Sequence, residues 1–337
     1  MSEGEFVFGF SLKLYTNKNY QIFKLGAKHL NDVADIRGLN NTYGLIYDDF
    51  DCNNSIKEKW EKNHPGMKIF TIVKRRNTVT MDSKISFAKK MKDSVYTPET
   101  YLNVNDIDTC DDAIETDKSL YFIKKNGSTG SVHVIVTKIS EIQKISKTID
   151  NLNEYIIQKS MSNPDLYEGK RYKIRAHVIL FNKNIYFHRK PWCTISKVKY
   201  NVECEDIKVL REMNVIYQAN AEKFITFDMI NENEKIEKNM LLAFEDFRRS
   251  YSNEIENVGD NEFSILGFDF VVNTEKNVNI IEINHRSNYQ HPQDVSNKTD
   301  VLCIRDLYIL LFTNSTKNTD LLPVRKEPKT SSLYELD

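Results

Sequence analysis

Several features that would place this 337-residue sequence in a familiar class are missing from it. The five cysteines are scattered, odd in number and never in CxxC spacing, which argues against a disulfide framework and a cysteine-based zinc site. The longest strongly apolar stretch near the end, residues 307–312, is far too short to span a bilayer. The first five residues include two glutamates and lack the features of a signal peptide. We therefore expect a cytoplasmic protein with no membrane partner.

An excess of charge of either sign is absent as well. The chain has 47 basic and 48 acidic residues, a formal net charge of −1, so the balance gives no reason to expect a nucleic-acid partner. Apolar residues make up 40% of the chain and charged residues 28%, which is typical of a globular protein. A chain of this length suffices for two or three lobes with cores of their own.

The pattern of apolar residues predicts an α/β (α+β) protein. Near the N-terminus, strands and helices alternate as in a small open α/β lobe. The elements expected there are strands at residues 5–12, 43–47 and 67–73 and helices at 20–33 and 57–63.

Further along the chain, strands come mostly in pairs, with helices between the pairs. The expected strands are residues 120–123, 132–136, 155–158, 173–181, 184–188, 264–272 and 278–283, and the expected helices are 81–91, 139–149, 233–252 and 301–312. The predicted division is an N-terminal lobe (1–76), a central lobe (77–154), a C-terminal lobe (155–313) and a flexible tail (314–337).

The polar residues of the last predicted hairpin are the most informative. Glu282 and Asn284 point the same way because side chains alternate along a strand. A loop at residues 274–277 pairs Asn273 with Val278 and so sets Asp269 opposite Glu282. Burying carboxylates among apolar strands costs free energy unless a cation lies beside them. Mg²⁺ takes oxygen ligands of this kind. The alternative is a set of ordinary polar positions on a half-exposed hairpin.

Two further segments carry positive charge. A strand that ends in Lys125 is followed by a small-residue loop, which contains Ser128 and Gly130 and lets backbone N–H groups approach phosphate oxygens. It is not a P-loop, because its spacing differs, and it could be an ordinary glycine-rich turn. Alternation also places Arg171, Lys173 and Arg175 on one strand face, where they repel unless an anion lies among them. A solvated basic face is the alternative for these three.

Taken together and in this order, these segments resemble the tubulin–tyrosine ligase family of ATP-grasp enzymes. The family pattern is a strand-borne Lys before a small-residue loop, Gln-Lys with a nearby Pro-Leu, Lys-Phe-Asp-x-Arg, a short Thr-Asn motif, and a Gly-x-Asp hairpin ending in Glu-x-Asn. The matching residues here are Lys125 with its loop, Gln158, Lys159, Pro164, Leu166, Arg171 to Arg175, Ala219 with Asn220, Gly267 to Asp269, and Glu282 to Asn284. The Lys-bearing segment 84–101 is similar to the family's entry into the central lobe.

This resemblance implies an ATP-grasp fold, in which a small N-terminal lobe precedes central and C-terminal lobes that enclose an ATP cleft. It implies ATP and Mg²⁺ as cofactors. The implied nucleotide-binding residues are Lys125 for the α- and β-phosphates, Ser128 and Gly130 in a lid, Gln158, Lys159, Ser160 and Met161 facing the adenine, and Lys173. The implied catalytic residues are Arg171, Arg175 and Asn220, and the implied metal ligands are Asp269, Glu282 and Asn284.

The activity implied by the resemblance is ATP-dependent ligation of an amino acid to a carboxylate of a protein or peptide, possibly tubulin, through an acyl phosphate. The chain departs from the family at Lys173, where the family has an acid. It also departs at Thr194, where the family has an acceptor-binding arginine that Arg189, Lys190 or Lys197 could replace. It also has His285-Arg286-Ser287 after the final motif, in place of a small residue and a proline. This extra positive charge points to an anionic acceptor. Two alternatives stay open: an ATP-grasp kinase of a polyanion such as an inositol phosphate, and a catalytically silent nucleotide-binding protein.

Overall fold

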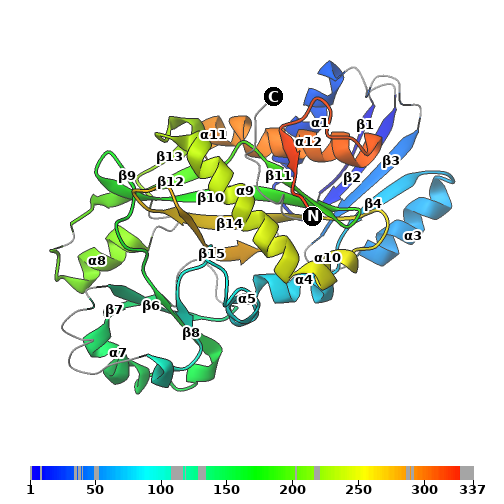
Figure 1. The fold of residues 1–337 in the computed structure, drawn as a ribbon. Coiled ribbons are helices and arrows are strands. Elements are labelled where there is room, and N and C mark those ends of the chain that lie inside the picture. The colour runs from blue at the N-terminus through cyan, green and yellow to red at the C-terminus, as the bar shows by residue number, and fades with distance from the viewer. Residues whose placement is uncertain are drawn as a thin grey trace.

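The computed structural model describes residues 2–326, apart from 8–9, 34–35, 37–38, 40, 49–52, 108–116, 118, 128–133, 202, 216–220, 286–288 and 290–291. Its strands form a large sheet of 12 strands and a small sheet of four. The large sheet runs through the upper part of the molecule, and the small one projects below it (Figure 1).

The N-terminal lobe begins with a hairpin and continues as a parallel sheet with helices. Strand β2 alternates between half-buried and buried positions, with Leu12 and Leu14 inside. The predicted single strand over residues 5–12 is wrong, because the chain reverses between β1 and β2, which pair antiparallel. The elements are β1 (Ser2–Val7), β2 (Ser11–Thr16), α1 (Tyr20–Lys28), η1 (His29–Asp32), β3 (Thr42–Tyr47), α3 (Asn53–Asn63) and β4 (Lys68–Ile72).

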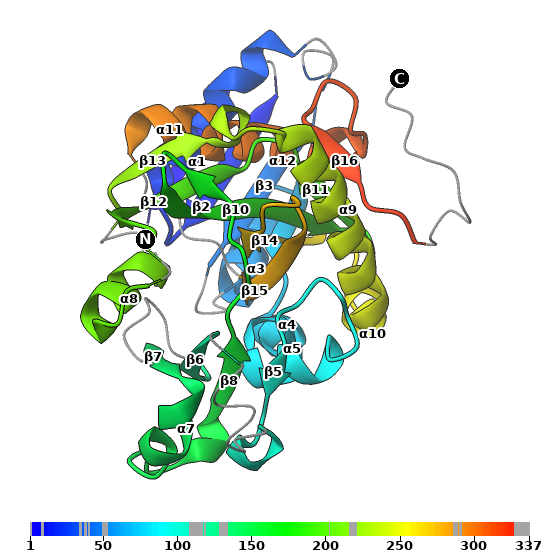
Figure 2. The same cartoon turned by 60° about the vertical axis from the view of Figure 1, so that its left-hand side comes forward.

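The central lobe is built on the small antiparallel sheet, in the order β5-β8-β6-β7, and has its own core. Tyr121 and Ile123 from β6 pack there with Ile142 from α7. The predicted boundary at residue 154 separates β8 from this lobe, but β8 pairs with both β5 and β6. Figure 2 shows the lobe set apart below the large sheet. The elements are β5 (Thr100–Tyr101), η2 (Val104–Asp106), β6 (Leu120–Lys125), β7 (Val134–Lys138), α7 (Ile139–Ser146), η3 (Leu152–Glu154) and β8 (Tyr155–Lys159).

The C-terminal lobe is organised around β10 (Lys170–Phe181), whose residues from Ile174 to Phe181 pair with β14 (Glu262–Val272). Both faces of the second half of β10 are covered, and its last four residues, 178–181, are therefore apolar on both sides. Alternate residues such as Ile174 and Val178 pack with helix α9, whereas Ile179 and Phe181 pack with helix α12. The tight turn predicted between β10 and β11 is present, with Asn182 and Lys183 at positive φ.

The remaining elements complete this lobe and its connections. The helix predicted over residues 81–91 is interrupted at Ser83, whose side chain accepts a hydrogen bond from the Ser86 N–H at 3.2 Å and so begins a second helix. The elements are α4 (Arg75–Asp82), α5 (Lys84–Lys90), β9 (Leu166–Tyr167), β11 (Asn184–His188), β12 (Trp192–Lys199), α8 (Ile207–Asn214), β13 (Lys223–Thr226), η5 (Phe227–Met229), α9 (Asn233–Ser250), α10 (Ser252–Glu256), β15 (Val278–Asn284), α11 (Gln293–Lys298), α12 (Asp300–Thr313) and β16 (Leu321–Pro323).

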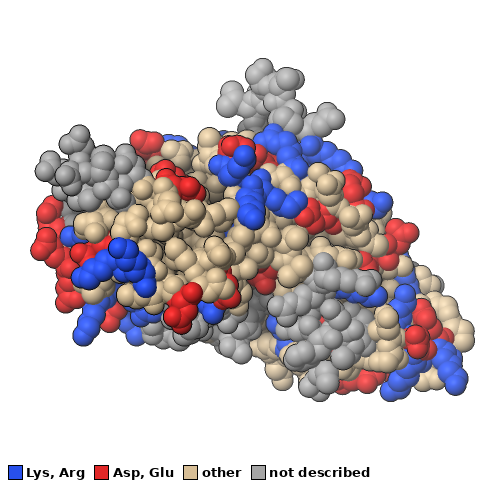
Figure 3. All heavy atoms as spheres, turned by 90° about the horizontal axis from the view of Figure 1, so that it is seen from below, with Lys and Arg blue, Asp and Glu red and all other residues tan. Residues whose placement is uncertain are grey.

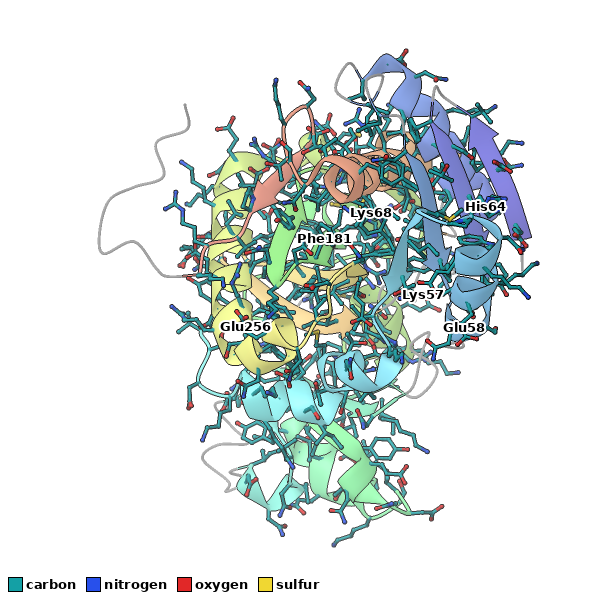
Figure 4. The ribbon with its side chains drawn as sticks, turned by 90° about the vertical axis from the view of Figure 1, so that its right-hand side faces the viewer. Lys57, Glu58, His64, Lys68, Phe181 and Glu256 are labelled. Carbon is teal, nitrogen blue, oxygen red and sulfur yellow. The ribbon has the colours of Figure 1, made fainter. Side chains whose placement is uncertain are left out.

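The N-terminal lobe and the C-terminal lobe share one sheet. β4 lies parallel to β14, with Thr71 opposite Glu262 and Ile72 opposite Phe263. Phe70 and Phe181 pack with ring centroids 6.0 Å apart, and Figure 4 shows Phe181 in the interior of the molecule. The close crossing of α1 over α12 requires glycine at position 26, because a Cβ there would lie 2.7 Å from Ile304. The two lobes are therefore packed as one body.

The C-terminal segment is more ordered than the sequence predicts. β16 pairs with β11, Leu321 is buried, and the guanidinium of Arg248 donates to the Val324 carbonyl at 2.7 Å. The predicted flexible tail is thus wrong for residues 314–326, and residues 327–337 lie outside the described chain. Nowhere in the described ranges does a helix combine the length and apolar content needed to cross a membrane.

Candidate nucleotide-binding site

A cavity lies between the central and C-terminal lobes, and its empty volume is about 840 Å³ when the open solvent at its mouth is included. The residues that line it include Lys84, Pro98, Phe122, Lys124, Val134, Gln158, Lys159, Ser160, Met161, Arg171, Tyr172, Lys173, Asn214, Val215, Val271, Ile281 and Glu282. The cavity thus has apolar walls and several converging charged groups.

The apolar walls come from facing strands of two sheets. Phe122 of β6 and Val134 of β7 line the cavity from the central lobe. Val271 of β14 and Ile281 of β15 line it from the C-terminal lobe. Two apolar surfaces of this kind can hold a flat ring between them.

Lys124 is the lysine of β6 that enters the cavity. It shares a strand face with Phe122, because the intervening Ile123 belongs to the core of the central lobe. Its ammonium group donates to Oε1 of the buried Gln158 at 2.5 Å, and Gln158 in turn donates to the Thr100 hydroxyl at 3.2 Å. Burial lowers the pKa of Lys124 to about 8, with Glu282 acting in the opposite direction. Lys124 is therefore a partly desolvated cation within the site.

Lys125, which the resemblance implies as the phosphate-binding lysine, does not line the cavity. Its ammonium group lies 3.3 Å from a carboxylate oxygen of Glu154, and its side chain is 39% exposed. The reason is alternation, since neighbouring residues of a strand point to opposite faces. Lys124, one residue earlier, is the lysine of this strand that lines the cavity.

The segment predicted to face the adenine does line the cavity: Gln158, Lys159, Ser160 and Met161 are all among its residues. The ammonium group of Lys159 lies 2.8 Å from Asp117. Burial alone would raise the pKa of Asp117, but the hydrogen bonds from Lys159 and Tyr121 outweigh it and hold that pKa well below its usual range. The Ser160 N–H donates to the Leu120 carbonyl at 2.7 Å and is already engaged in the sheet.

The register of the late hairpin brings Asp269 opposite Glu282, as predicted. Its turn differs by one residue, because Val278 pairs with Val272 and not with Asn273. A register shift between Asp269 and Phe270 restores the expected alignment.

Asn284 lies opposite Gly267 on the neighbouring strand and donates to its carbonyl at 3.4 Å. Neither Asn284 nor Asp269 is among the residues that line the cavity, whereas Glu282 is. The three predicted metal ligands thus lie on one hairpin at or just behind the cavity wall.

Asp269 is held between two cations. It is 1% exposed, and its Oδ1 accepts from Arg175 Nε at 2.5 Å while its Oδ2 accepts from Lys173 Nζ at 2.9 Å. Burial would raise the pKa of this carboxyl group, but Arg175 and Lys173 outweigh it and keep the pKa well below its ordinary value. The anion expected among the basic residues of β10 is therefore Asp269, and Arg175 reaches it from behind the cavity wall.

Arg171 is buried and lines the cavity. Its guanidinium donates to Asn214 Oδ1 and lies 5.9 Å from the Tyr200 ring centroid. Burial lowers its pKa to about 10, so it remains charged at neutral pH. Within the described chain no carboxylate pairs with it. The alternative of a solvated basic strand face is wrong for Arg171 and Arg175, which are both 6% exposed.

Glu282 faces a lysine from a distant part of the chain. Its Oε1 lies 2.8 Å from Nζ of Lys84, at the start of α5, and the Lys84 side chain is only 9% exposed. The sequence indicated a lysine-bearing segment here but not this contact. His285 directly follows this hairpin, and its Nδ1 lies 3.0 Å from Oδ2 of Asp82.

Several predicted residues fall elsewhere. Ser128, Gly130, Asn220 and Arg286 lie outside the described residues, so the lid and the Thr-Asn motif have no structural account. Thr194 is fully buried, and its hydroxyl donates to the Lys173 carbonyl at 3.5 Å. Arg189 and Lys190 line a different pocket, where Arg189 pairs with Glu237 at 2.8 Å.

This fold, with a cavity between two lobes, is that of an ATP-grasp protein, as a comparison with solved structures shows. The C-terminal domain of Pby1 from K. lactis, an ATP-grasp enzyme that interacts with the mRNA decapping enzyme Dcp2, is similar in structure, with a TM-score of 0.60 and 15% identity. The match covers 94% of this chain and 99% of that one, and it confirms the predicted fold.

The family follows from the sequence itself. The model of the tubulin-tyrosine ligase family matches residues 57–307, and the chain belongs to this family. No curated protein matches the chain.

Proposed function

We propose that the chain binds ATP in the cavity between the central and C-terminal lobes and uses it to join an amine to a carboxylate. The observation that carries this proposal is the composition of the cavity, in which apolar walls lead to a group of cations. Phe122 and Val271 suit a purine, whereas Lys124 and Arg171 suit phosphates. Membership of a family of ATP-grasp enzymes supports ATP as the nucleotide.

The reaction requires little covalent participation by the protein. An acceptor carboxylate oxygen forms a bond to the γ-phosphorus, and the bond from that phosphorus to the β–γ bridging oxygen breaks, releasing ADP. An amine then attacks the acyl carbon, phosphate leaves, and the nitrogen loses a proton. Catalysis of such steps depends on positioning and on charge stabilisation. Lys124 and Arg171 are the side chains placed to supply that charge.

Mg²⁺ is the second cofactor implied by the family resemblance, and the donor set does not fit it as it stands. Both carboxylate oxygens of Asp269 already accept hydrogen bonds from cations, and Glu282 is paired with Lys84. A divalent cation at Asp269 would be in repulsion with Lys173 and Arg175. The positive charge in the proposed reaction is therefore assigned to side chains of the protein.

The acceptor in this proposal is anionic, because the cavity carries more positive than negative side chains. A peptide rich in carboxylates, such as a tubulin tail, and a compact polyanion both satisfy this condition. The buried Thr194 is not placed to bind an amino-acid carboxylate as the arginine of the family does.

The test is turnover of labelled ATP by the purified chain, with and without divalent cation. The panel contains single amino acids, tubulin, a glutamate-rich peptide and inositol phosphates. Release of ADP that requires both an amino acid and a carboxylate acceptor would support the ligase. Transfer of the label to an inositol phosphate would show that the chain is a kinase and would contradict the proposed ligase activity.

A nucleotide-binding protein without turnover is the second candidate. The specific observation in its favour is the ion pair between Lys173 and Asp269, which occupies the carboxylate that the family resemblance implies as a metal ligand. ATP binding without ADP release under every condition of the panel would support it.

The affinity for ATP is expected to fall as the pH rises above about 8. Lys124 is protonated below its lowered pKa of about 8 and loses its charge above it. A bound phosphate raises that pKa, so affinity should fall by up to about tenfold per pH unit between the free and the bound pKa. Dissociation constants measured by calorimetry across this pH range check the prediction. The Lys124→Arg variant, which stays charged, should show a flatter profile, and equal slopes in the two proteins would contradict it.

A further inference from the structure

We propose that this site binds ATP without a divalent cation, with the ammonium group of Lys173 supplying the positive charge near the phosphates. The inference rests on the proposed nucleotide site and concerns how that site neutralises its ligand. It starts from the cluster of Lys173, Asp269 and Arg175, in which two cations share one buried carboxylate.

The balance of charge around the cavity favours an anion over a cation. The basic side chains at or behind the walls are Lys84, Lys124, Lys159, Arg171, Lys173 and Arg175. The acidic groups that face them in the described structure are Glu282, Asp269, Asp117 and Glu99. Positive charge is therefore in excess here, although the whole chain has a formal net charge of −1.

This excess is local. Acidic and basic side chains are interspersed on the face of the molecule shown in Figure 3. Within the cavity, Lys124 and Arg171 have no carboxylate partner among the described residues. An ATP molecule without metal brings more negative charge than its metal complex, and two uncompensated, partly desolvated cations favour that form.

A divalent cation would have to displace existing partners. To reach Asp269, it would have to move Lys173 away from a carboxylate that is 1% exposed and is also bound by Arg175. The displaced ammonium would then stand close to Lys124, whose pKa is already lowered in part by Lys173. Removing one partner of a buried ion pair is strongly unfavourable.

Lys173 itself is suited to contact phosphate. Its side chain is 14% exposed and lines the cavity. An ammonium group has three N–H donors, so the bond to Asp269 leaves others for phosphate oxygens. Asp269 fixes the position of the ammonium group, and Arg175 holds Asp269 from the other side.

The experiment is a titration of the full chain with ATP, followed by calorimetry, once in excess Mg²⁺ and once in excess EDTA. The chain should bind ATP in EDTA at least as tightly as in Mg²⁺. A strict requirement for Mg²⁺ would overturn the inference while leaving the nucleotide site in place. Failure to bind in both conditions would instead refute the proposed function.

The variant Lys173→Asp provides a second arm. It is expected to lose about tenfold or more in affinity in EDTA, since a charge-assisted contact is replaced by repulsion, and to recover when Mg²⁺ is added. The matched control is Lys197→Asp on β12, which makes the same charge change at an exposed position outside the cavity. Equal behaviour of the two variants would overturn the role of Lys173.

A measurement on the unmodified chain avoids any dependence on how a variant folds. Mn²⁺ bound to a protein–nucleotide complex has a broadened electron paramagnetic resonance spectrum. With ATP and Mn²⁺ present, the chain is expected to leave the spectrum of Mn²⁺ in solution unchanged. A new protein-bound Mn²⁺ signal that appears only with ATP would refute metal-free binding.

Discussion

Replacing Lys124 by alanine is expected to weaken ATP binding by about tenfold to a hundredfold, because a charge-assisted hydrogen bond is removed from a desolvated site. Lys124 combines a place in the cavity, a 2.5 Å contact with the buried Gln158 and a pKa lowered by burial. Among the described residues, its ammonium group has no carboxylate partner. We therefore expect a bound phosphate to form a strong interaction with it. Calorimetric titration with ATP at about neutral pH measures the loss, where Lys124 is charged.

The matched control is Lys125→Ala, in the same strand and one residue away. Lys125 pairs with Glu154 on the opposite face, in a half-exposed ion pair of the kind that contributes little. Its removal should leave the affinity for ATP nearly unchanged. A larger loss at Lys125 than at Lys124 would show that the lysine implied by the family resemblance is the correct one.

Replacing Asp269 by asparagine is expected to lower the free energy of unfolding by about 3–5 kcal/mol, the range for breaking a buried ion pair. The asparagine side chain has nearly the same shape but no charge, so Lys173 and Arg175 would both lose their counter-ion. Urea unfolding followed by circular dichroism gives the change. Glu168→Gln, which breaks an exposed pair with Lys223 at 2.7 Å, is the control and should leave the unfolding midpoint where it is.

The pH dependence of this stability has a definite sign. The pKa of Asp269 is lowered by its two cations against the effect of burial, so its contribution is complete above the unfolded-state pKa of about 4. It is lost only as the pH falls from there through the lower folded-state pKa. The stabilities of the original chain and Asp269→Asn should therefore converge in acid. A constant difference down to the acid transition would mean that the charge of Asp269 is not the cause.

The late hairpin was the part of the site that sequence reasoning placed best. Alternation along a strand is a local rule, and with a short loop it sufficed to set Asp269 opposite Glu282. The loop pairing was nevertheless off by one residue. A bulge beside Asp269 made up the difference, and such a bulge depends on packing that the strand pattern does not encode.

The choice between Lys124 and Lys125 could not be made from the sequence. Because side chains alternate along a strand, two adjacent lysines must point to opposite faces. The alternation does not determine which of the two faces packs against the core. Tyr121 and Phe122 are both aromatic, and only the structure shows that Tyr121 packs in the core whereas Phe122 lines the cavity. An apolar pattern on both faces of a strand leaves the orientation open.

Contacts between segments that are far apart in the chain could not be predicted from the sequence either. Lys84 and Glu282 are far apart in the chain, and nothing local to either predicts their 2.8 Å pairing. The same applies to β16, a strand of three residues in a polar segment. β16 forms by pairing with the backbone N–H and C=O groups at the edge of β11. That edge exists only after the rest of the sheet has assembled.

The parallel pairing of β4 with β14 determines which part of the molecule can move when a ligand enters. Ladder hydrogen bonds join the first 72 residues to the strand that carries Asp269, so one rigid base supports one side of the cavity. The four-stranded sheet of the central lobe has a separate core, and the chain enters and leaves it near residues 91–100 and 159–166. If ATP binds between the lobes as proposed, we expect this sheet to be the part that moves when the nucleotide enters or leaves, and substitutions that stiffen the two crossings are expected to slow nucleotide exchange without contacting the nucleotide.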